Sequence, residues 1–379
     1  MLLLLLTLIF LRPFISSLAF PLSSFIYSCL LLSSLVIWIV LRGLSVERIK
    51  PLQYPLLLFI LALLISVAFS QNIALSIANL DKYLSAILIL TIASSLGKDA
   101  DKIISCLLFA ALAISCLAIY QYLFGFQHVL NYMAKNSIYS AFTQDYLIQK
   151  RVFFPFVTPN TLAGYLAMLL GFAFAEKHKI IFLLPLISAL LLTRSLGGMI
   201  SAAFATFLYF YLARNVSKKK ASSIVVLAML IVLAVFAVRL TATKTHFQPA
   251  FSAAMRFSYW HDTLRIIATH PLVGIGVGNF NLAYSRFSHN SYLQIWAEMG
   301  ILGITSFLWI IAALLRNALK NIKSRAHKNR LACLIAGSAA FCIHNLFDFS
   351  FYLPEVSLLW WVICGLMLAQ VIPQRTKFQ

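Results

Sequence analysis

Long apolar stretches separated by short polar joints are the feature that most restricts how this chain can fold. About twelve of them follow one another, and an apolar helix of roughly 20 residues is long enough to cross a lipid bilayer. Hydrophobic residues make up 62% of the chain and charged residues only 11%, far from the composition of soluble domains. The pattern predicts an all-α polytopic membrane protein. The predicted spans are 1–20, 22–41, 54–69, 73–96, 103–124, 162–175, 180–192, 199–213, 222–238, 292–315, 331–346 and 356–372.

Neither the first residues nor the cysteines indicate any special processing or metal site. The opening MLLLLLTLIF has no basic residue and no small-residue cleavage site, so it is predicted to be a first membrane helix and not a removed signal peptide. All six cysteines lie within apolar runs and form no CxxC pair, which is typical of small buried hydrophobic residues. We therefore expect no bound metal and no other cofactor.

The net charge of +20 is distributed as membrane topology requires, and not as a surface that binds nucleic acid. Most of the 30 Lys and Arg residues lie in alternate short joints, on one side of the predicted spans. Basic residues are retained on the cytoplasmic side of a membrane, so these joints and both termini are predicted to be cytoplasmic. The lipid bilayer is the expected environment, and no nucleic acid partner is predicted.

Two long joints on the opposite side, residues 125–160 and 239–288, carry several basic residues against few acidic ones. A third, short joint on that side, 193–198, contains Arg194. Arginine offers a permanent charge and a fork of donors that suits phosphate oxygens. The three joints therefore predict capture of an anionic group at the outer membrane surface. The alternative is that these arginines only reach towards lipid headgroups.

The second long joint has helical composition over 255–269. Arg256 and Trp260 are four residues apart and share a face of that helix, whereas Arg256 and Arg265 are nine apart and lie about half a turn out of phase. The two arginines therefore cannot reach one ligand from the same face of a straight helix, and we favour Arg256 as the anion ligand. In the HPLVGIGVGNF segment that follows, Gly276 and Gly278 favour a tight turn over a ligand-binding loop.

The segment RFSHNSYLQIWAEMGILGI places His289 and Asn290 directly before an apolar run that contains Glu298, Gly300 and Gly303. If a helix begins near the histidine, steps of about 100° per residue put both glycines on its face, where they allow a neighbouring backbone to approach closely. The glutamate would lie opposite and need a partner from elsewhere. A histidine at the outer surface suits a general base, the alternative being a capping or merely hydrogen-bonded residue.

His289-Asn290, followed after nine residues by Gly300-x-x-Gly303, forms an H-N-x9-G-x-x-G motif. Four further stretches accompany it: RVFFPFVTPNTLAGYLA, with Arg151, Pro159 and Asn160; TRSLGGMISA, with Arg194; RFSYWHDTLRIIATHPLVGIGVGNF, with Arg256 and Trp260; and HNLFDFSFYLPE. In this order, across residues 151–355, they resemble the O-antigen ligase and O-antigen polymerase superfamily, which contains bacterial glycan ligases that depend on a lipid carrier.

The resemblance implies a metal-independent glycosyltransferase on the periplasmic face of the bacterial inner membrane. Such enzymes take a glycan from an undecaprenyl-diphosphate carrier and place it on an acceptor hydroxyl. By motif position, His289 would be the base that activates the acceptor, and Arg151 and Arg256 would bind the diphosphate. Arg194 and Arg265 are the remaining candidate ligands. Relatives usually have Ser followed by Arg where this chain has Arg194 followed by Ser195, and Arg265 matches no arginine of the family motifs.

Several functions remain compatible with this resemblance. We favour an O-antigen ligase of lipopolysaccharide biosynthesis that transfers the glycan to lipid A–core, with residues 1–124 forming five N-terminal spans and 125–379 the ligase-like region. An O-antigen polymerase that extends a surface polysaccharide, or a protein O-oligosaccharyltransferase, belongs to the same superfamily. A membrane transporter is the alternative from a different class; against it, no inverted repeat is visible in the sequence and few charged residues lie in mid-span.

Overall fold

The computed structural model describes residues 1–43, 46–137, 147, 149–213, 218–240, 248–322 and 328–371. Among these residues the chain forms helices and loops without a named β-strand, which confirms the predicted all-α class. Several basic residues of the predicted joints, including those within 214–217, 323–327 and 372–379, lie outside the described residues, as do parts of both long loops.

The helices follow one another with short connections. Their bounds are α1 Leu2–Leu11, η1 Arg12–Phe14, α2 Pro21–Arg42, α3 Val46–Ile49, η2 Lys50–Leu52, α4 Gln53–Ala68, α5 Ile73–Ala78, α6 Leu80–Ser95, η3 Gly97–Asp99, α7 Ala100–Tyr120, η4 Gln121–Gly125, α8 Phe126–Lys135, α10 Pro159–Ala175, α11 Lys179–Thr193, α12 Leu196–Ala213, α13 Lys218–Leu240, α14 Pro249–Thr269, α15 Ser291–Asn321, α16 Lys328–His344, η7 Ser350–Tyr352 and α17 Pro354–Val371.

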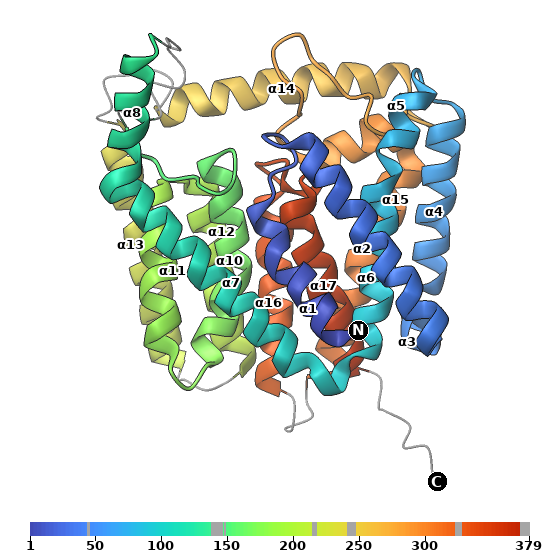
Figure 1. Cartoon of the computed structure of the whole chain (residues 1–379), viewed down its shortest axis with the longest axis horizontal. Coiled ribbons are helices and arrows are strands. Elements are labelled where there is room, and N and C mark those ends of the chain that lie inside the picture. Colours follow the sequence, from blue (N-terminus) through green and yellow to red (C-terminus); the bar gives the residue numbers. More distant parts are fainter. Residues whose placement is uncertain are drawn as a thin grey trace.

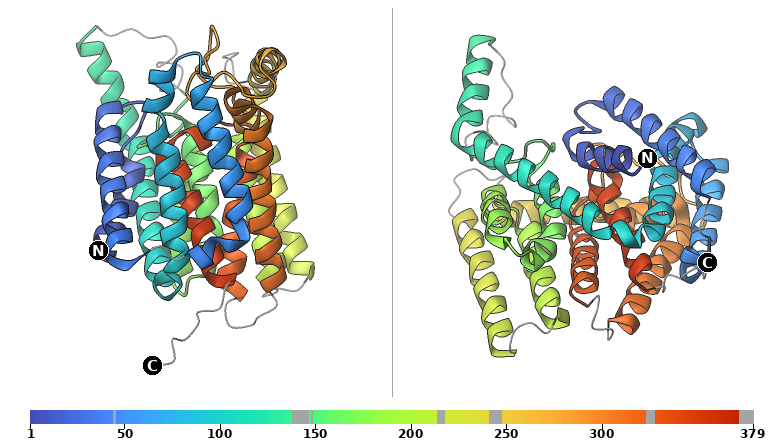
Figure 2. Two further views of the ribbon diagram at one scale, coloured as in Figure 1. Left: turned by 90° about the vertical axis from the view of Figure 1, so that its right-hand side faces the viewer. Right: turned by 60° about the horizontal axis from the view of Figure 1, so that its bottom comes forward.

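The long helices run roughly side by side, and α14 lies across one end of this bundle (Figure 1). A view turned by 90° shows α14 almost end-on above the other helices (Figure 2), so its axis is close to perpendicular to theirs. The start of α1 and the end of α17 lie away from α14, in the lower half of the molecule as drawn (Figure 1). The end covered by α14 also holds α5, α8 and the loop that leads into α15, and it is the end that carries the candidate site.

A helix lies within each of the twelve predicted spans. Seven helical segments among the described residues are long and apolar enough to cross a membrane, and further apolar helices are shorter. These helices indicate a multi-pass membrane protein. The seven segments are Pro21–Arg42, Glu47–Ala68, Ile73–Ser95, Gly97–Lys135, Leu196–Ala213, Ser291–Asn321 and Pro354–Val371.

The predicted first span, 1–20, is wrong in length because α1 ends at Leu11. Pro13 follows within one turn, and its ring nitrogen cannot donate the hydrogen bond that would continue the helix. Arg12 turns inward at this break, where its Nη2 lies 3.4 Å from the Glu355 carboxylate at the start of α17 and its guanidinium lies over the Tyr27 ring. The buried ion pair fixes the chain between α1 and α2 to the centre of the bundle.

Both long loops begin or end differently from the prediction. The helix after residue 100 does not stop at 124 but continues through the π-helical turn η4 into α8, as far as Lys135. In the second loop, α14 begins at Pro249, six residues before the predicted start, because a proline is well suited to the first turn of a helix. The longest element of the second loop is therefore one surface helix, α14.

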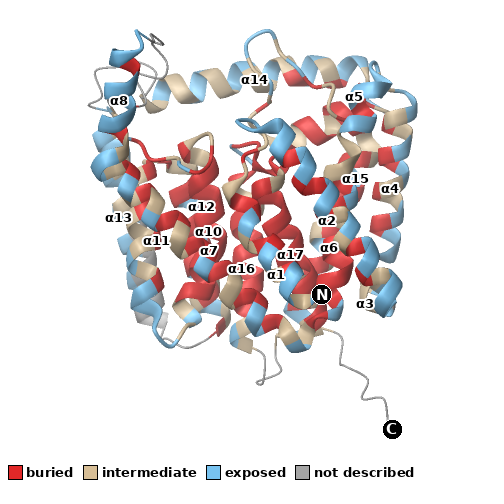
Figure 3. Ribbon diagram, viewed as in Figure 1, coloured by how far each residue is buried: buried red, intermediate tan, exposed pale blue. Residues whose placement is uncertain are grey.

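The centre of the bundle is formed by α10, α16 and α17, whose residues are almost all buried (Figure 3). Trp360 stacks on Phe341 with ring centroids 4.9 Å apart, and its indole N–H donates to Ser338 Oγ, so the buried polar atom is satisfied. A Cβ at Gly365 would come within 2.4 Å of the Leu90 carbonyl oxygen, so this glycine is what lets α17 approach α6 so closely. The resulting close-packed centre supports the loops above it.

Candidate functional site

A cavity of about 470 Å³ lies beneath α14 and joins segments that are far apart in the sequence. Its walls come from the starts of α10 and α12, the segment before α10, the end of α13 and one face of α14. The loop before α15 adds His289, and the loop after α16 adds Phe347. Three arginines and one histidine line it: Arg151, Arg239, Arg256 and His289. No acidic side chain lines this cavity among the described residues. The cavity is therefore suited to an anionic ligand.

The sequence predicted that the helix begins near His289. In the structure His289 instead lies in a turn before α15. Its φ of +53° is in the left-handed region, and the helix begins only at Ser291. Asn290 is the N-cap, since its Oδ1 accepts hydrogen bonds from the backbone N–H groups of Tyr292 and Leu293. Because of this turn, the imidazole does not follow the direction of the α15 side chains and lines the cavity under α14.

Aromatic rings fix the imidazole on two sides. The ring of Tyr259, on α14, stacks on His289 with centroids 5.0 Å apart, and Phe349 meets it edge-on at 4.9 Å. The backbone of the turn is held as well: Ser288 Oγ donates to the Asn290 carbonyl oxygen, and the Ser288 N–H donates to Gln294 Oε1. His289 is thus positioned by contacts from three different segments.

The electrostatic surroundings keep His289 neutral. Burial lowers the pKa of its imidazole to about 4; the negative charge of Asp348 opposes this shift, and the positive charge of Arg256 adds to it. The imidazole therefore has a nitrogen lone pair available near pH 7. Asp348 itself is ionised, because hydrogen bonds from His344 and Ser350 lower the pKa of its carboxyl by more than burial raises it.

Arg256 and Trp260 both face the cavity from α14, as their four-residue spacing predicts. The guanidinium of Arg256 donates from Nε to the Phe347 carbonyl oxygen at 3.1 Å and from Nη1 to the Ser252 carbonyl oxygen. Arg265 does not line the cavity: its side chain is 73% exposed and lies 3.7 Å from Asp262 on the outer side of α14. The two arginines thus lie on different faces of the helix.

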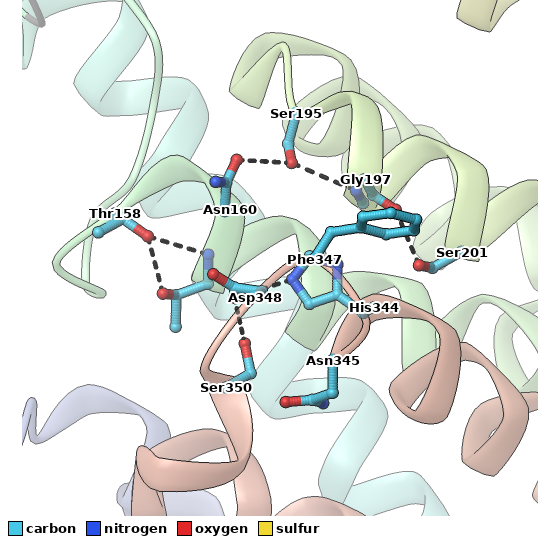
Figure 4. A network of polar contacts seen from close by, with 12 residues as sticks. Thr158, Asn160, Ser195, Gly197, Ser201, His344, Asn345, Phe347, Asp348 and Ser350 are labelled. Carbon is cyan, nitrogen blue, oxygen red and sulfur yellow. Dashed lines mark hydrogen bonds and ion pairs between the residues drawn. The ribbon is translucent and has the colours of Figure 1, made fainter. Parts of the chain in front are cut away.

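Arg151 is buried at the cavity wall, held by a hydrogen bond from its Nε to the Thr193 carbonyl oxygen. Its Nη2 lies 3.4 Å from Asn160 Oδ1, which also accepts a hydrogen bond from Ser195 Oγ (Figure 4). Asn160 is brought there by the start of α10, where Pro159 occupies the first helical position after the N-cap Thr158. Residues from the ends of three helices thus meet at this wall.

Arg194 lies beside this group without lining the cavity. It is the C-cap of α11, in the left-handed region with φ +50°, and the neighbouring Ser195 makes the contact with Asn160 instead. With this order of the two residues, the hydroxyl of Ser195 and not the guanidinium of Arg194 contacts Asn160 of the cavity lining.

The glycines of HPLVGIGVGNF form tight turns against the helices around them. Gly276 has φ +103° and Gly278 has φ +76°, values that favour glycine. A Cβ at Gly276 would meet Ser70 Oγ at 2.2 Å, and the Gly278 N–H donates to the Glu298 carboxylate. This loop supplies the partner that Glu298 needs, together with Gln294, whose Nε2 donates to the other carboxylate oxygen.

The predicted helical face shared by His289, Gly300 and Gly303 is wrong. Gly300 has φ +64° and ψ −168°, so α15 is broken there and a constant step of 100° per residue does not apply. A Cβ at Gly300 would lie 2.0 Å from the Leu272 carbonyl oxygen. The close backbone approach therefore comes from the loop after α14, while a Cβ at Gly303 would meet the Met299 side chain of its own helix.

Sequence reasoning missed three contributors to the site. Arg239 ends α13 and donates from Nη2 to Ser252 Oγ, and Tyr259 supplies the ring beneath His289. Asp348, whose charge acts on His289, lies in the HNLFDFSFYLPE stretch. Asp348 could have been found from the sequence, because it is a charged residue among the apolar residues of this stretch. The spacing of Tyr259 and His289 along the chain gave no sign that their rings stack.

Chemically, the cavity combines fixed positive charge with a neutral, positioned imidazole. Arginines can hold phosphate oxygens and stabilise charge that develops on a leaving group. A neutral imidazole within the same cavity can accept a proton from a hydroxyl. Among the described residues no group of three or more His, Cys, Asp and Glu side chains comes together as metal ligands would.

Residues 181–308 match the family model described as O-antigen ligase, and no curated protein matches the chain. The matched segment is about a third of the chain and includes α11 to α14, His289, Asn290, Gly300 and Gly303. Arg151 and Asn160 precede it and meet it in space at the cavity. The match supports the resemblance inferred from the motifs: over residues 181–308 the chain is similar to the O-antigen ligase family.

Proposed function

We propose that this protein is an O-antigen ligase: it transfers an O-antigen-type glycan from an undecaprenyl-diphosphate carrier to a hydroxyl of lipid A–core on the periplasmic face of the inner membrane. One observation carries the proposal. Arg151, Arg239, Arg256 and the neutral His289 line one cavity, and the family match covers two of the three arginines and the histidine. A diphosphate and a hydroxyl are the two groups that such a cavity suits.

In the proposed reaction the acceptor hydroxyl gives its proton to the His289 imidazole as its oxygen forms a bond to the anomeric carbon of the donor sugar. The bond between that carbon and the diphosphate oxygen breaks, and undecaprenyl diphosphate leaves with both electrons of the bond. Arg151 and Arg256 bind the diphosphate and stabilise its developing negative charge. Arg239 adds a third positive charge at the same cavity.

The surroundings of His289 fit the role of a base. Its imidazole is neutral before the reaction and becomes positively charged during it, and the negative charge of the buried Asp348 stabilises that cation. Stacking on Tyr259 limits the orientations of the ring. We assign no diphosphate contact to Arg265, whose exposed position on α14 fits contact with lipid headgroups or a second substrate.

For the membrane we propose twelve spans, with α14 at the periplasmic surface and both termini in the cytoplasm. In this arrangement residues 1–124 form the N-terminal spans and 125–379 carry the catalytic cavity. The start of α1 and the end of α17 lie away from α14 (Figure 1), and the positive-inside rule assigns the basic joints of the sequence to that side. A carrier held by its tail in the bilayer would then present its diphosphate at the depth of the cavity.

Deletion of the gene in its host, followed by gel analysis of surface polysaccharide, tests the proposal. A ligase predicts loss of the lipid-linked ladder while carrier-bound polymer still accumulates, and recovery on expression of the wild-type chain but not of His289→Ala. A single repeat attached to the core would instead indicate a polymerase, and loss of glycan from a protein would indicate a protein oligosaccharyltransferase. Unchanged glycans with altered uptake of a small molecule would indicate a transporter.

A further inference from the structure

A second cavity, of about 500 Å³, opens on the other side of the segment that carries His289. Its walls are the loop between α1 and α2, the junction of α5 and α6, the segment from Gly278 to Phe287, and the first turns of α15. It shares none of its lining residues with the cavity under α14. The chain passes between the two: Phe287 lines the second cavity and His289 lines the first.

The second cavity differs from the first in charge. Its polar lining combines two carboxylates, two cationic side chains and four amides: Asp81, Glu298, Lys82, Arg286, Asn79, Asn279, Asn281 and Gln294. The two carboxylates offset the two cations, so this lining attracts a diphosphate less than the first cavity does, whereas its mixed donors and acceptors suit a ligand with many hydroxyl groups. The mixture therefore favours a neutral polyhydroxylated ligand over an anion.

One acceptor in this cavity is buried without a partner. Asp81 Oδ1 has no hydrogen-bond donor among the described residues, although a buried carboxylate oxygen is costly to leave unsatisfied. The other buried carboxylate, that of Glu298, is occupied on both oxygens, by the N–H of Gly278 and by Gln294 Nε2. Asp81 lines the cavity, so a rotation of its carboxylate that brings this oxygen to a ligand hydroxyl would complete the set.

Aromatic side chains supply the apolar part of the lining. Phe280, Phe287 and Tyr352 line the cavity, and the flat faces of such rings suit the C–H faces of sugar rings. Phe287 stacks on Phe349 with centroids 4.1 Å apart, and Phe349 in turn meets His289 edge-on at 4.9 Å. These rings and the short chain from Phe287 to His289 lie between the second cavity and the proposed base.

We propose that the second cavity binds the sugar portion of the acceptor; this rests on the proposed transferase function and deepens it. The reacting hydroxyl of the acceptor must itself lie at His289, so the second cavity would hold the neighbouring sugars, across the His289 turn from the diphosphate. Gln294 connects the cavity to the turn, since it lines the cavity and its Oε1 accepts from the N–H of Ser288. Acceptor binding against Gln294 is therefore transmitted to the residue next to His289.

The test is binding to the full-length protein in lipid nanodiscs, with three probes: lipid A–core purified from the deletion host, undecaprenyl diphosphate, and the glycan-linked carrier. Asp81→Asn and Asn281→Ala should weaken lipid A–core binding roughly tenfold, the effect of one lost hydrogen bond, and leave undecaprenyl diphosphate binding unchanged. Arg256→Lys should do the reverse. Asn321→Ala, an exposed asparagine at the far end of α15, is the matched control.

Three results would overturn the proposal: unchanged lipid A–core affinity in both cavity variants, an equal loss of undecaprenyl diphosphate affinity, or weaker binding of the glycan-linked carrier alone. The last would move the sugar site to the donor. Asn281 is exposed, so its variant remains informative even if Asp81→Asn fails to fold. Failure of the proposed function has a different signature, because a wild-type protein that binds all three probes without transferring glycan would contradict the reaction and not the site.

Discussion

The imidazole of His289 lies flat against the ring of Tyr259, with centroids 5.0 Å apart and planes inclined by 20°. The two residues come from different segments, so this stack connects α14 to the turn before α15. An aromatic pair of this kind contributes about 0.5–1.5 kcal/mol beyond its buried area, which corresponds to roughly 2- to 10-fold in rate when it orients a reacting group.

We therefore expect Tyr259→Ala to lower the transfer rate by at least that factor, and Tyr259→Phe, which keeps the ring, to stay close to wild type. Initial rates with a purified carrier-linked glycan and lipid A–core measure both variants. Equal activity of the alanine variant would show that stacking does not position the base.

His289→Ala should abolish transfer while leaving protein levels normal. A general base contributes roughly a hundredfold or more to rate, and the described cavity lining holds no second histidine to replace it. His261→Ala is the control, because His261 is on the same surface helix but is exposed and faces Asp262 instead of the cavity. A ladder on the gel from cells that carry only His289→Ala would refute the assignment.

Arg256→Lys should weaken donor use more than Arg265→Lys does. Lysine keeps the charge but loses the fork of donors, and hydrogen bonds to charged groups contribute about 1.5–3 kcal/mol, so we expect roughly a 10- to 100-fold loss in kcat/KM for the carrier-linked donor. Arg265 serves as the matched control, since it shares α14 but lies away from the cavity. Similar values for both variants would mean that Arg256 only contacts lipid headgroups.

The pH dependence of transfer should reflect the neutral state of His289. Because burial lowers its pKa to about 4, the base stays deprotonated as the pH falls through the usual histidine range near 6.5 and becomes protonated only near pH 4. The acid limb of kcat/KM is thus expected near pH 4, with activity level above about pH 5. A limb centred near pH 6.5 in a protein that remains folded would contradict a buried base.

Gly300→Ala should destabilise the protein far more than Gly43→Ala. Both glycines have a positive φ and a nearly extended ψ, a conformation that costs other residues about 1–3 kcal/mol. Only at Gly300 would the added Cβ strike a neighbouring backbone, at 2.0 Å from the Leu272 carbonyl oxygen, whereas nothing lies within 4 Å at Gly43. Thermal unfolding in detergent compares the two, and equal midpoints would argue against close packing at Gly300.

The helices and the candidate residues could be predicted from the sequence because the relevant signals are local. Apolar run length determines where a chain can cross a bilayer, and the four-residue spacing of Arg256 and Trp260 correctly put both on one face of α14. Arg151 and His289 were identified in the same local way, since each is a polar residue within a short motif next to an apolar run.

The rest of the site depends on backbone angles and on contacts between distant segments. The predicted helical face assumed regular helix from His289 to Gly303. The positive φ values of His289 and Gly300 interrupt that helix, and residue spacing alone does not predict such angles. Arg239 and Tyr259 join the site only because α14 folds back over the bundle. A buried proline, Pro13, shortened the first helix in a way that its apolar composition concealed.

The exposed apolar side chains of α14 have a practical consequence for measuring transfer. Phe257 lines the cavity that would take the carrier and is 65% exposed, and Leu264, two turns further along the helix, is 49% exposed. If these side chains rest in the headgroup layer, the donor reaches the site by lateral diffusion within the membrane plane. Rates should then follow the number of carrier molecules per unit of bilayer area. Diluting vesicles at a fixed carrier-to-lipid ratio should leave turnover unchanged, while adding carrier-free lipid to the same vesicles should slow it.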